Sequence, residues 1–187
     1  MALSIAKGIQ ETYSLEVIGR TKEALDQFEA ALGCSVQKTL YEESTCEAKT
    51  LIVCVKPYNL PEISTRLRGK AKALYSVLAG TPLSSLHSIS AVSYVRAMPN
   101  LAAEVSLSMT SLVGDASLRE EAVGLFSSIG NTLWLGSEKE LDIATALAGS
   151  GPAYLTLIAE ALCDGAVREG LKRDDAMTLM RGLFAGF

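Results

Sequence analysis

The sequence predicts an α/β fold in which a doubly wound parallel β-sheet is followed by an all-helical segment. Three observations lead to this prediction. Short strand patterns alternate with helical patterns as far as Leu135. Residues 50–55 form a nearly continuous apolar run, which is typical of a parallel strand buried on both faces. After Ser137 every segment has helical periodicity, so we expect domains over residues 1–136 and 137–187.

The elements of the first domain are short and alternate in type. Strands are predicted over residues 15–18, 35–40, 50–55, 73–77, 91–95, 109–113 and 131–135. Helices are predicted over residues 1–11, 22–32, 61–68, 82–88 and 118–129. Gly33 suits the end of the second helix, because glycine adopts the left-handed conformation of a C-cap without strain. The alternation favours strands joined by helical crossovers, as in a parallel sheet.

The second domain is expected to contain helices over residues 138–147, 152–169 and 174–184. Gly170 is expected to follow the second helix and Asp174 to cap the third. Apolar residues are numerous in this segment, and a piece of about 50 residues is too small to bury them by itself. We therefore expect these helices to form an oligomer interface.

Composition excludes several classes of protein. The formal net charge is −4 with no block of like charges, which argues against nucleic acid or an anionic membrane as the main partner. No uninterrupted apolar run reaches about 18 residues, so no membrane span is expected, and no secretory signal pattern opens the chain. Four scattered cysteines and a single histidine, His87, favour free thiols in a reducing cytoplasm and no metal site.

Ligands of open parallel sheets bind at the carboxyl ends of the strands. Arg20, Thr21 and Lys22 follow the first predicted strand. Two cations and a hydroxyl suit the 2′-phosphate of NADP better than the ribose hydroxyl of NAD. The alternative is a solvated basic turn that opens a helix.

Other strand ends carry weaker signals. Lys56, held by the rigid Pro57, either faces a ligand or is an exposed lysine at the end of a strand. Asn100 either presents its amide to a nicotinamide or substrate or is an ordinary turn residue. Arg96 is expected to pair with a carboxylate, and His87 to be exposed or hydrogen-bonded rather than catalytic.

The run from Ala148 to Tyr154 has the composition of a ligand-binding turn. Gly149, Ser150, Gly151 and Pro152 predict a tight turn that presents a hydroxyl and free N–H groups at a helix N-terminus. Such a turn is suited to a carboxylate or phosphate. The alternative is an ordinary helix start.

Taken in order along the chain, several motifs resemble 1-pyrroline-5-carboxylate reductase, the family that catalyses the last step of proline biosynthesis. They are Val55-Lys56-Pro57, Val77-Leu78-Ala79-Gly80, Arg96-Ala97-Met98-Pro99-Asn100, Met109-Thr110-Ser111 and Gly149-Ser150-Gly151-Pro152-Ala153-Tyr154. The resemblance covers nearly the whole chain. It implies a Rossmann-like NADP-binding domain, a helical domain that dimerises or forms a higher oligomer, and hydride transfer from NADPH, or alternatively NADH, to 1-pyrroline-5-carboxylate.

The resemblance also implies roles for individual residues. Cofactor contacts are implied for Met1, Ala2, Arg20, Thr21, Lys22, Cys54, Val55, Lys56, Pro57, Val77, Leu78, Ala79, Gly80, Met98 and Asn100. Ser150, Gly151 and Pro152 are implied to lie toward the substrate. No residue is assigned as catalytic, and no metal is implied.

The resemblance further implies that two family features are absent from these 187 residues. Met1 to Ser4 correspond to the end of the glycine-rich turn, so the first strand and its glycines are expected to be missing, as is a later loop that binds the substrate carboxylate. Two alternatives therefore stay open. One is a non-catalytic oligomerisation or nucleotide-binding fragment, and the other is a different reductase of the same architecture.

Overall fold

The computed structural model describes residues 1–186, and Phe187, at the end of the predicted helical domain, lies outside the described residues. The chain divides into two compact units, Met1–Gly149 and the residues from Ser150 onward. The division falls between the π-helix Thr145–Gly149 and α7 (Gly151–Arg168). The preceding helix α6 (Glu138–Ala144) belongs to the first unit, where its Leu141 is buried. Our predicted boundary at about Gly136 lies before this helix.

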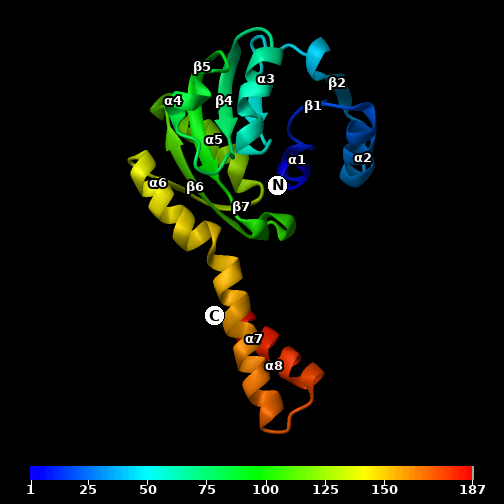
Figure 1. Ribbon diagram of the computed structural model, residues 1–187, viewed down its shortest axis with the longest axis vertical. Helices are drawn as coiled ribbons and strands as arrows, with labels where there is room; N and C mark the ends of the chain where they lie inside the picture. Colours follow the sequence, from blue (N-terminus) through cyan, green and yellow to red (C-terminus); the bar gives the residue numbers. More distant parts are fainter. Residues whose placement is uncertain (187) are drawn as a thin grey trace. The chain divides into compact units, whose positions relative to one another are not determined.

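The strands of the first unit form two sheets rather than one (Figure 1). β1 (Glu16–Gly19) and β2 (Gln37–Leu40) pair in parallel with each other. The second sheet has the order β3-β4-β5-β6-β7, with the bounds Thr50–Val53, Ala71–Ser76, Ala91–Met98, Ser108–Gly114 and Gly130–Trp134. The expectation of a single sheet is therefore wrong, because in the described part of the chain no strand bridges the edges of β1 and β3.

The larger sheet is parallel except for the β5–β6 pair, which is antiparallel. The connection between these two strands explains the exception. Only residues 99–107 join β5 to β6, and they contain the short 3₁₀ segment Leu101–Val105. A parallel crossover needs a dozen or more residues, so this connection returns the chain in the opposite direction.

Helices cover both faces of the larger sheet, as the doubly wound prediction requires. α1 (Ala2–Ile9) and α5 (Arg119–Ser127) pack on one face, where the ring of Phe126 meets that of Tyr75 edge to face with the centroids 6.1 Å apart. α3 (Leu60–Arg66) and α4 (Leu83–Leu86) cover the other face. The nearly continuous apolar sequence of β3 contributes to both faces, because Ile52 packs against one core cluster and Val53 against the other, although only Val53 is fully buried.

Local capping signals account for α2 (Lys22–Leu32). The Thr21 hydroxyl accepts a hydrogen bond from the Ala24 N–H at 3.2 Å, which satisfies one free donor of the first turn. Gly33 ends the helix in the left-handed conformation with φ +83°, as predicted.

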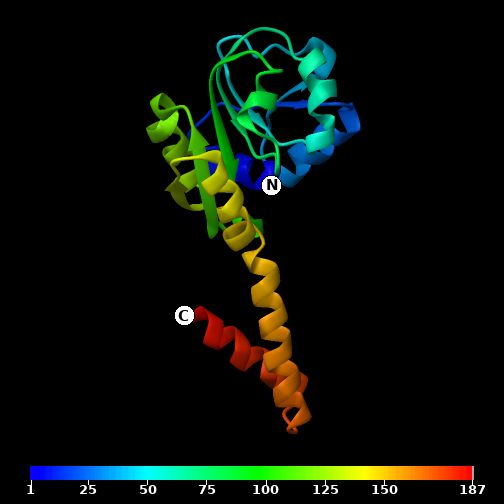
Figure 2. The same cartoon turned by 60° about the vertical axis from the view of Figure 1, so that its left-hand side comes forward.

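The second unit is a pair of helices, α7 (Gly151–Arg168) and α8 (Arg173–Ala185), which lie side by side in Figures 1 and 2. Cys163 of α7 and Ala176 of α8 are buried. The prediction that Asp174 caps α8 is wrong, because Lys172 occupies the cap position and Asp174 lies inside the first turn. A carboxylate in that turn still interacts favourably with the helix dipole.

Candidate functional site

Three of the predicted ligand-binding segments lie at one edge of the larger sheet. β4 pairs in parallel with both β3 and β5, so Ser76 has Val53 on one side and Arg96 on the other. The Val77 N–H donates to the Val53 carbonyl at 3.1 Å. The structure therefore brings together the segments that follow these strands, residues 54–57, 77–80 and 98–100.

The exposed part of this edge is formed by residues around Lys56 and Gly80. The side chain of Leu78 is buried, whereas Lys56 and Ala79 are exposed. Gly80 adopts φ +64°. A hollow of about 590 Å³ borders this edge at Pro57 and Gly80, and most of its lining comes from α3 and from the residues around α4.

Met1 and Ala2 lie at the same edge, next to Cys54. Ala2 and Cys54 line a common cleft. Burial raises the pKa of the Cys54 thiol to about 12, and the positive charge of the Met1 amino group acts in the opposite direction. The amino end of the chain is therefore close to the carboxyl end of β3.

Arg20, Thr21 and Lys22 lie at the carboxyl end of β1, in the smaller sheet. The Arg20 guanidinium donates to the Glu62 carboxylate at 2.6 Å, and their side chains are 57% and 33% exposed. Exposed pairs of this kind contribute only about 0–1 kcal/mol, so Glu62 is a weak competitor for a phosphate. With Lys22 opening the eleven-residue helix α2, the donor set fits a phosphate group.

Arg96 pairs with carboxylates, as predicted. Its side chain is 5% exposed and donates to Glu138 at 2.8 Å and to Asp142 at 3.0 Å. Glu138 also accepts a hydrogen bond from the Leu83 N–H at 2.8 Å. Neither acidic partner was among the predicted site residues. Their signal was a pair of carboxylates one helical turn apart on α6 (Glu138–Ala144).

The side chain of Asn100 is already engaged within the protein. Its Nδ2 donates to the Ala148 carbonyl at 3.0 Å, and its Oδ1 accepts from the Ala102 N–H at 3.1 Å. The Asn100 N–H donates to the Ser108 hydroxyl, which is 3.1 Å from the buried Thr110 hydroxyl. These contacts connect the interior of β6 to the π-helix Thr145–Gly149 and give Asn100 a positioning role.

Substitution of Asn100 tests this role. Asn100→Ala removes two hydrogen bonds of Asn100, each worth about 0.5–1.5 kcal/mol, so we expect the first unit to lose about 1–3 kcal/mol of unfolding free energy. Amide exchange in residues 145–149 should accelerate more than elsewhere. The control is Asn131→Ala, at an exposed position of β7, which should change stability by less than about 0.5 kcal/mol. Equal exchange rates in both variants would contradict the positioning role.

The tight turn predicted at Gly149–Gly151 is not formed. Helical backbone continues from the π-helix into α7, and Ser150 has φ −90° and ψ −12° with no side-chain capping bond. Gly149 and Gly151 have helical conformation. The backbone N–H groups of this segment are therefore not available to a ligand in the way that they are at the start of an isolated helix. Pro152 does lie in the first turn of α7, as expected.

Comparisons with known proteins give the family. The model for pyrroline-5-carboxylate reductase dimerisation matches residues 138–187, and the model described as NADP oxidoreductase coenzyme F420-dependent matches residues 1–80. Pyrroline-5-carboxylate reductase of Helicobacter pylori is 33% identical over an alignment that covers 100% of this chain and 76% of that protein. This chain belongs to the pyrroline-5-carboxylate reductase family.

Solved reductases agree with the fold. The 1-pyrroline-5-carboxylate reductase of Streptococcus pyogenes superposes with a TM-score of 0.88 at 28% identity, over 100% of this chain and 73% of that one. The Plasmodium falciparum enzyme, solved with NADP bound, has a TM-score of 0.74 at 22% identity, over 98% and 71% of the two chains. The predicted family, α/β class and helical dimerisation segment are thus confirmed, and this chain spans about three quarters of its relatives' length.

One helical stretch among the described residues, Glu138–Arg168, is long and apolar enough to cross a membrane by length and composition alone. It was not expected from the sequence, because no uninterrupted apolar run reaches about 18 residues. The dimerisation model covers the same stretch. Its apolar surface therefore has an explanation as a protein interface.

Proposed function

We propose that this chain reduces 1-pyrroline-5-carboxylate to L-proline with a hydride from NADPH, or alternatively NADH. The main evidence for this proposal is the alignment of the entire chain with a pyrroline-5-carboxylate reductase at 33% identity. The sheet edge described above supports the proposal, because dinucleotide folds bind their cofactors at the carboxyl ends of the strands.

Each segment of that edge has a proposed role. Arg20 and Lys22 hold the 2′-phosphate of the cofactor, while Thr21 fixes the start of α2. Met1 and Ala2 with residues 54–57, 77–80 and 98–100 surround the rest of the cofactor, and Asn100 acts by holding the Ala148 carbonyl. Residues 150–152 are proposed to contact the substrate. The bound cofactor supplies the hydride, and the protein aligns donor and acceptor.

The activity is tested by following NADPH oxidation by the purified chain with 1-pyrroline-5-carboxylate. The same assay is run on the chain extended to the full length of its relatives. Oxidation by either form supports the proposed reaction, and oxidation by the extended form alone supports a non-catalytic role for the 187-residue chain. Activity in neither form, despite NADPH binding, would contradict the proposed substrate and favour another reductase of this architecture.

Arg20→Ala tests the cofactor preference. Loss of a charge-assisted pair with phosphate costs about 1.5–3 kcal/mol, so we expect the Kd of NADPH to rise about 10- to 100-fold while that of NADH stays within twofold. Titration of cofactor fluorescence measures both constants. Arg66→Ala is the charge-matched control, because Arg66 also pairs with Glu62, at 3.4 Å, but lies at the end of α3. An unchanged NADPH preference in Arg20→Ala would contradict the assignment.

We also propose a homodimer or higher oligomer formed through the helices of the second unit, and a cytoplasmic location. Apolar side chains of α7 are exposed in the single chain, including Leu157 at 64% and Ile158 at 52%. Burial against a second copy would remove this surface from water. The free cysteines, Cys34, Cys46, Cys54 and Cys163, fit a reducing compartment.

A further inference from the structure

Residues 78–83 join β4 to α4 and overlap the segment that is proposed to contact the cofactor. Gly80 in this segment is exposed, and the other side-chain hydrogen bonds of the segment stay within residues 76–81. In the part of the chain that the structure describes, one hydrogen bond alone connects the segment to an element other than β4 and α4. The Leu83 N–H donates it to Glu138 at 2.8 Å. The start of α6 therefore holds this segment in place.

A single oxygen atom of Glu138 joins this segment to strand β5. The Glu138 Oε1 accepts hydrogen bonds from the Leu83 N–H and from the Arg96 guanidinium, at 2.8 Å in both cases. Arg96 lies on β5 and is paired with Ser76, the last residue of β4. The segments that follow β4 and β5 are neighbours at the proposed cofactor edge, so Glu138 fixes the position of one of them relative to the other.

The charge of Arg96 keeps Glu138 in this position. The Arg96 side chain is 5% exposed, and its Nε is buried without a hydrogen-bond partner among the described residues. The rest of the guanidinium donates to Glu138 and to Asp142, one helical turn further along α6. Separating a buried cation from its carboxylates is unfavourable. The helix α6 therefore cannot move away from β5 without leaving that charge unpaired.

The helical stretch formed by α6 and the following π-helix is also held at its other end. Arg96, Met98 and Asn100 are two residues apart in extended chain, so their side chains lie on the same side. Asn100 donates to the Ala148 carbonyl at 3.0 Å. The Met98 Cε lies 3.7 Å from the position of a Cβ added to Gly149. The stretch is therefore fixed against the strand ends at both of its own ends.

A segment that is already ordered binds a ligand more tightly than a mobile one of the same composition, because it loses less conformational entropy on binding. Gly80 has φ +64° and no Cβ, so by itself the backbone around it has many alternative conformations. The hydrogen bond from Leu83 to Glu138 restricts these conformations before a ligand binds. Glu138 can therefore affect affinity without touching the ligand.

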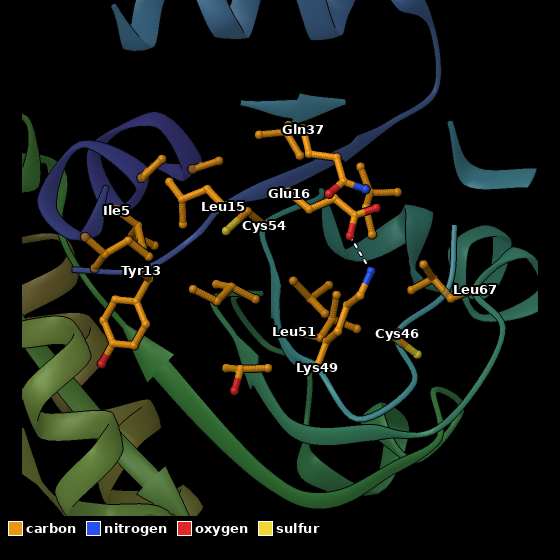
Figure 3. A pocket seen from close by; sticks show the side chains of 18 of the residues that line it. Ile5, Tyr13, Leu15, Glu16, Gln37, Cys46, Lys49, Leu51, Cys54 and Leu67 are labelled. Carbon is orange, nitrogen blue, oxygen red and sulfur yellow. Dashed lines mark hydrogen bonds and ion pairs between the residues drawn. The ribbon is translucent and has the colours of Figure 1, made fainter. Parts of the chain in front are cut away.

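We propose that Glu138 is a positioning residue for the cofactor: its carboxylate holds residues 78–83 against β5 and thereby orders the backbone that contacts the dinucleotide. The inference rests on the proposed function for the identity of the ligand. It concerns the strand ends rather than the cleft between the two sheets, which Figure 3 shows with Leu15 on one side and Leu51 on the other. None of residues 78–83 lines that cleft.

Leu83→Pro tests the hydrogen bond directly. Leu83 is the first residue of α4, a position where proline is tolerated. Pro82 has φ −71° and ψ 159°, the extended conformation that is favoured before a proline. The substitution therefore removes the N–H donor and leaves the course of the backbone unchanged. Leu83→Ala is the matched control, because it removes the leucine side chain and keeps the N–H.

A second pair of variants separates this hydrogen bond from the charge of Arg96. Glu138→Gln and Asp142→Asn each neutralise one carboxylate that pairs with Arg96. Only Glu138 also accepts the hydrogen bond from Leu83. All four substitutions are made in the two forms of the protein used for the activity assay. Titration of cofactor fluorescence gives the Kd of NADPH and of NADH. Amide exchange without cofactor measures the order of residues 77–81, with β3 as the reference.

We expect Leu83→Pro to raise the Kd of both cofactors about 3- to 10-fold relative to Leu83→Ala, the range that one net hydrogen bond accounts for. Amide exchange in residues 77–81 should accelerate by a similar factor, with β3 unchanged. Glu138→Gln should raise both Kd values at least about threefold, and Asp142→Asn less than about twofold. The equal effect on NADPH and NADH distinguishes this role from that of Arg20, whose substitution is expected to affect NADPH alone.

Equal Kd values for Leu83→Pro and Leu83→Ala would overturn the proposal, even with faster exchange, because the hydrogen bond would then have only a structural role. Equal effects of Glu138→Gln and Asp142→Asn would also overturn it, since the charge around Arg96 would then control binding. If neither parent form binds either cofactor, the proposed function is contradicted instead. The exchange comparison then decides by itself whether Glu138 orders the segment.

Discussion

Replacing Gly130 by alanine is expected to destabilise the first unit by at least about 3 kcal/mol, because both the backbone conformation and the space exclude a side chain. Gly130 opens β7 with φ +142°, a conformation that residues with a Cβ rarely adopt. An added Cβ would lie 2.1 Å from the Ser108 carbonyl oxygen and 2.3 Å from its nitrogen. These backbone atoms start the β6–β7 pairing, so relief of the clash requires the two strands to separate.

Gly124→Ala is the matched control. Gly124 lies within α5, and no heavy atom outside its immediate surroundings lies within 4 Å of an added Cβ. Alanine at such a helical site should stabilise the protein by about 0.5–1 kcal/mol. Urea unfolding of the two variants measures the difference, and a Gly130→Ala protein as stable as Gly124→Ala would contradict the close packing of β6 on β7.

Elements with local signals were predictable from the sequence. The bounds of α2 were predicted to the residue, because Thr21 caps its first turn and Gly33 ends it within the same short segment. β5 was predicted too short, since it continues to Met98 through Arg96, a charged residue that normally argues against a buried strand. Its charge is compensated by Glu138 and Asp142, more than forty residues away in sequence.

The pairing of strands was less predictable, because it depends on contacts between distant segments. The sequences of β1 and β2 have strand patterns like that of β3. Nothing in these two sequences indicates that β1 and β2 form a separate sheet. The antiparallel direction of β6 does have a sequence signal in the short connection after β5. The signal contradicts a wholly parallel sheet, so our prediction was wrong for the β5–β6 pair.

The position of the candidate site could be predicted from the ends of the strands. The hydrogen bonds that its side chains make could be found only in the structure. The rule that ligands bind at carboxyl ends brought out residues 54–57, 77–80 and 98–100, which the fold places at one edge. It did not reveal that Asn100 is bonded to Ala148, or that the Thr21 hydroxyl is used for capping. Such hydrogen bonds depend on which atoms come into contact after folding. The type of a residue alone does not predict its hydrogen-bond partner.

The second unit provides the other large expected effect, because Ile158→Glu should abolish dimerisation at micromolar concentrations. On α7 the positions of Tyr154, Ile158 and Leu162 repeat every four residues and form one exposed apolar stripe. Cys163, which is buried, lies on a different side of the helix. The stripe therefore remains available after α7 and α8 have packed together.

The size of the effect follows from symmetry. A two-fold dimer contains each substitution twice, and the loss of one buried isoleucine costs about 2 kcal/mol. About 4 kcal/mol corresponds to a roughly 1,000-fold increase in the dimer Kd. The two introduced carboxylates add a desolvation cost, so this figure is a lower bound.

Thr156→Glu is the control that separates an interface from a general effect of charge on α7. Thr156 is exposed on the same helix but about 160° around its axis from Ile158, and the substitution introduces the same carboxylate. Sedimentation over a range of concentrations should find Thr156→Glu within about threefold of the parent Kd, with unchanged helix content in both variants. If both substitutions dissociate the dimer equally, the apolar stripe is not its interface. If neither substitution dissociates the dimer, the exposed leucines and isoleucine of α7 must contact a different partner. A continuous apolar surface of this kind is unfavourable when it is exposed to water.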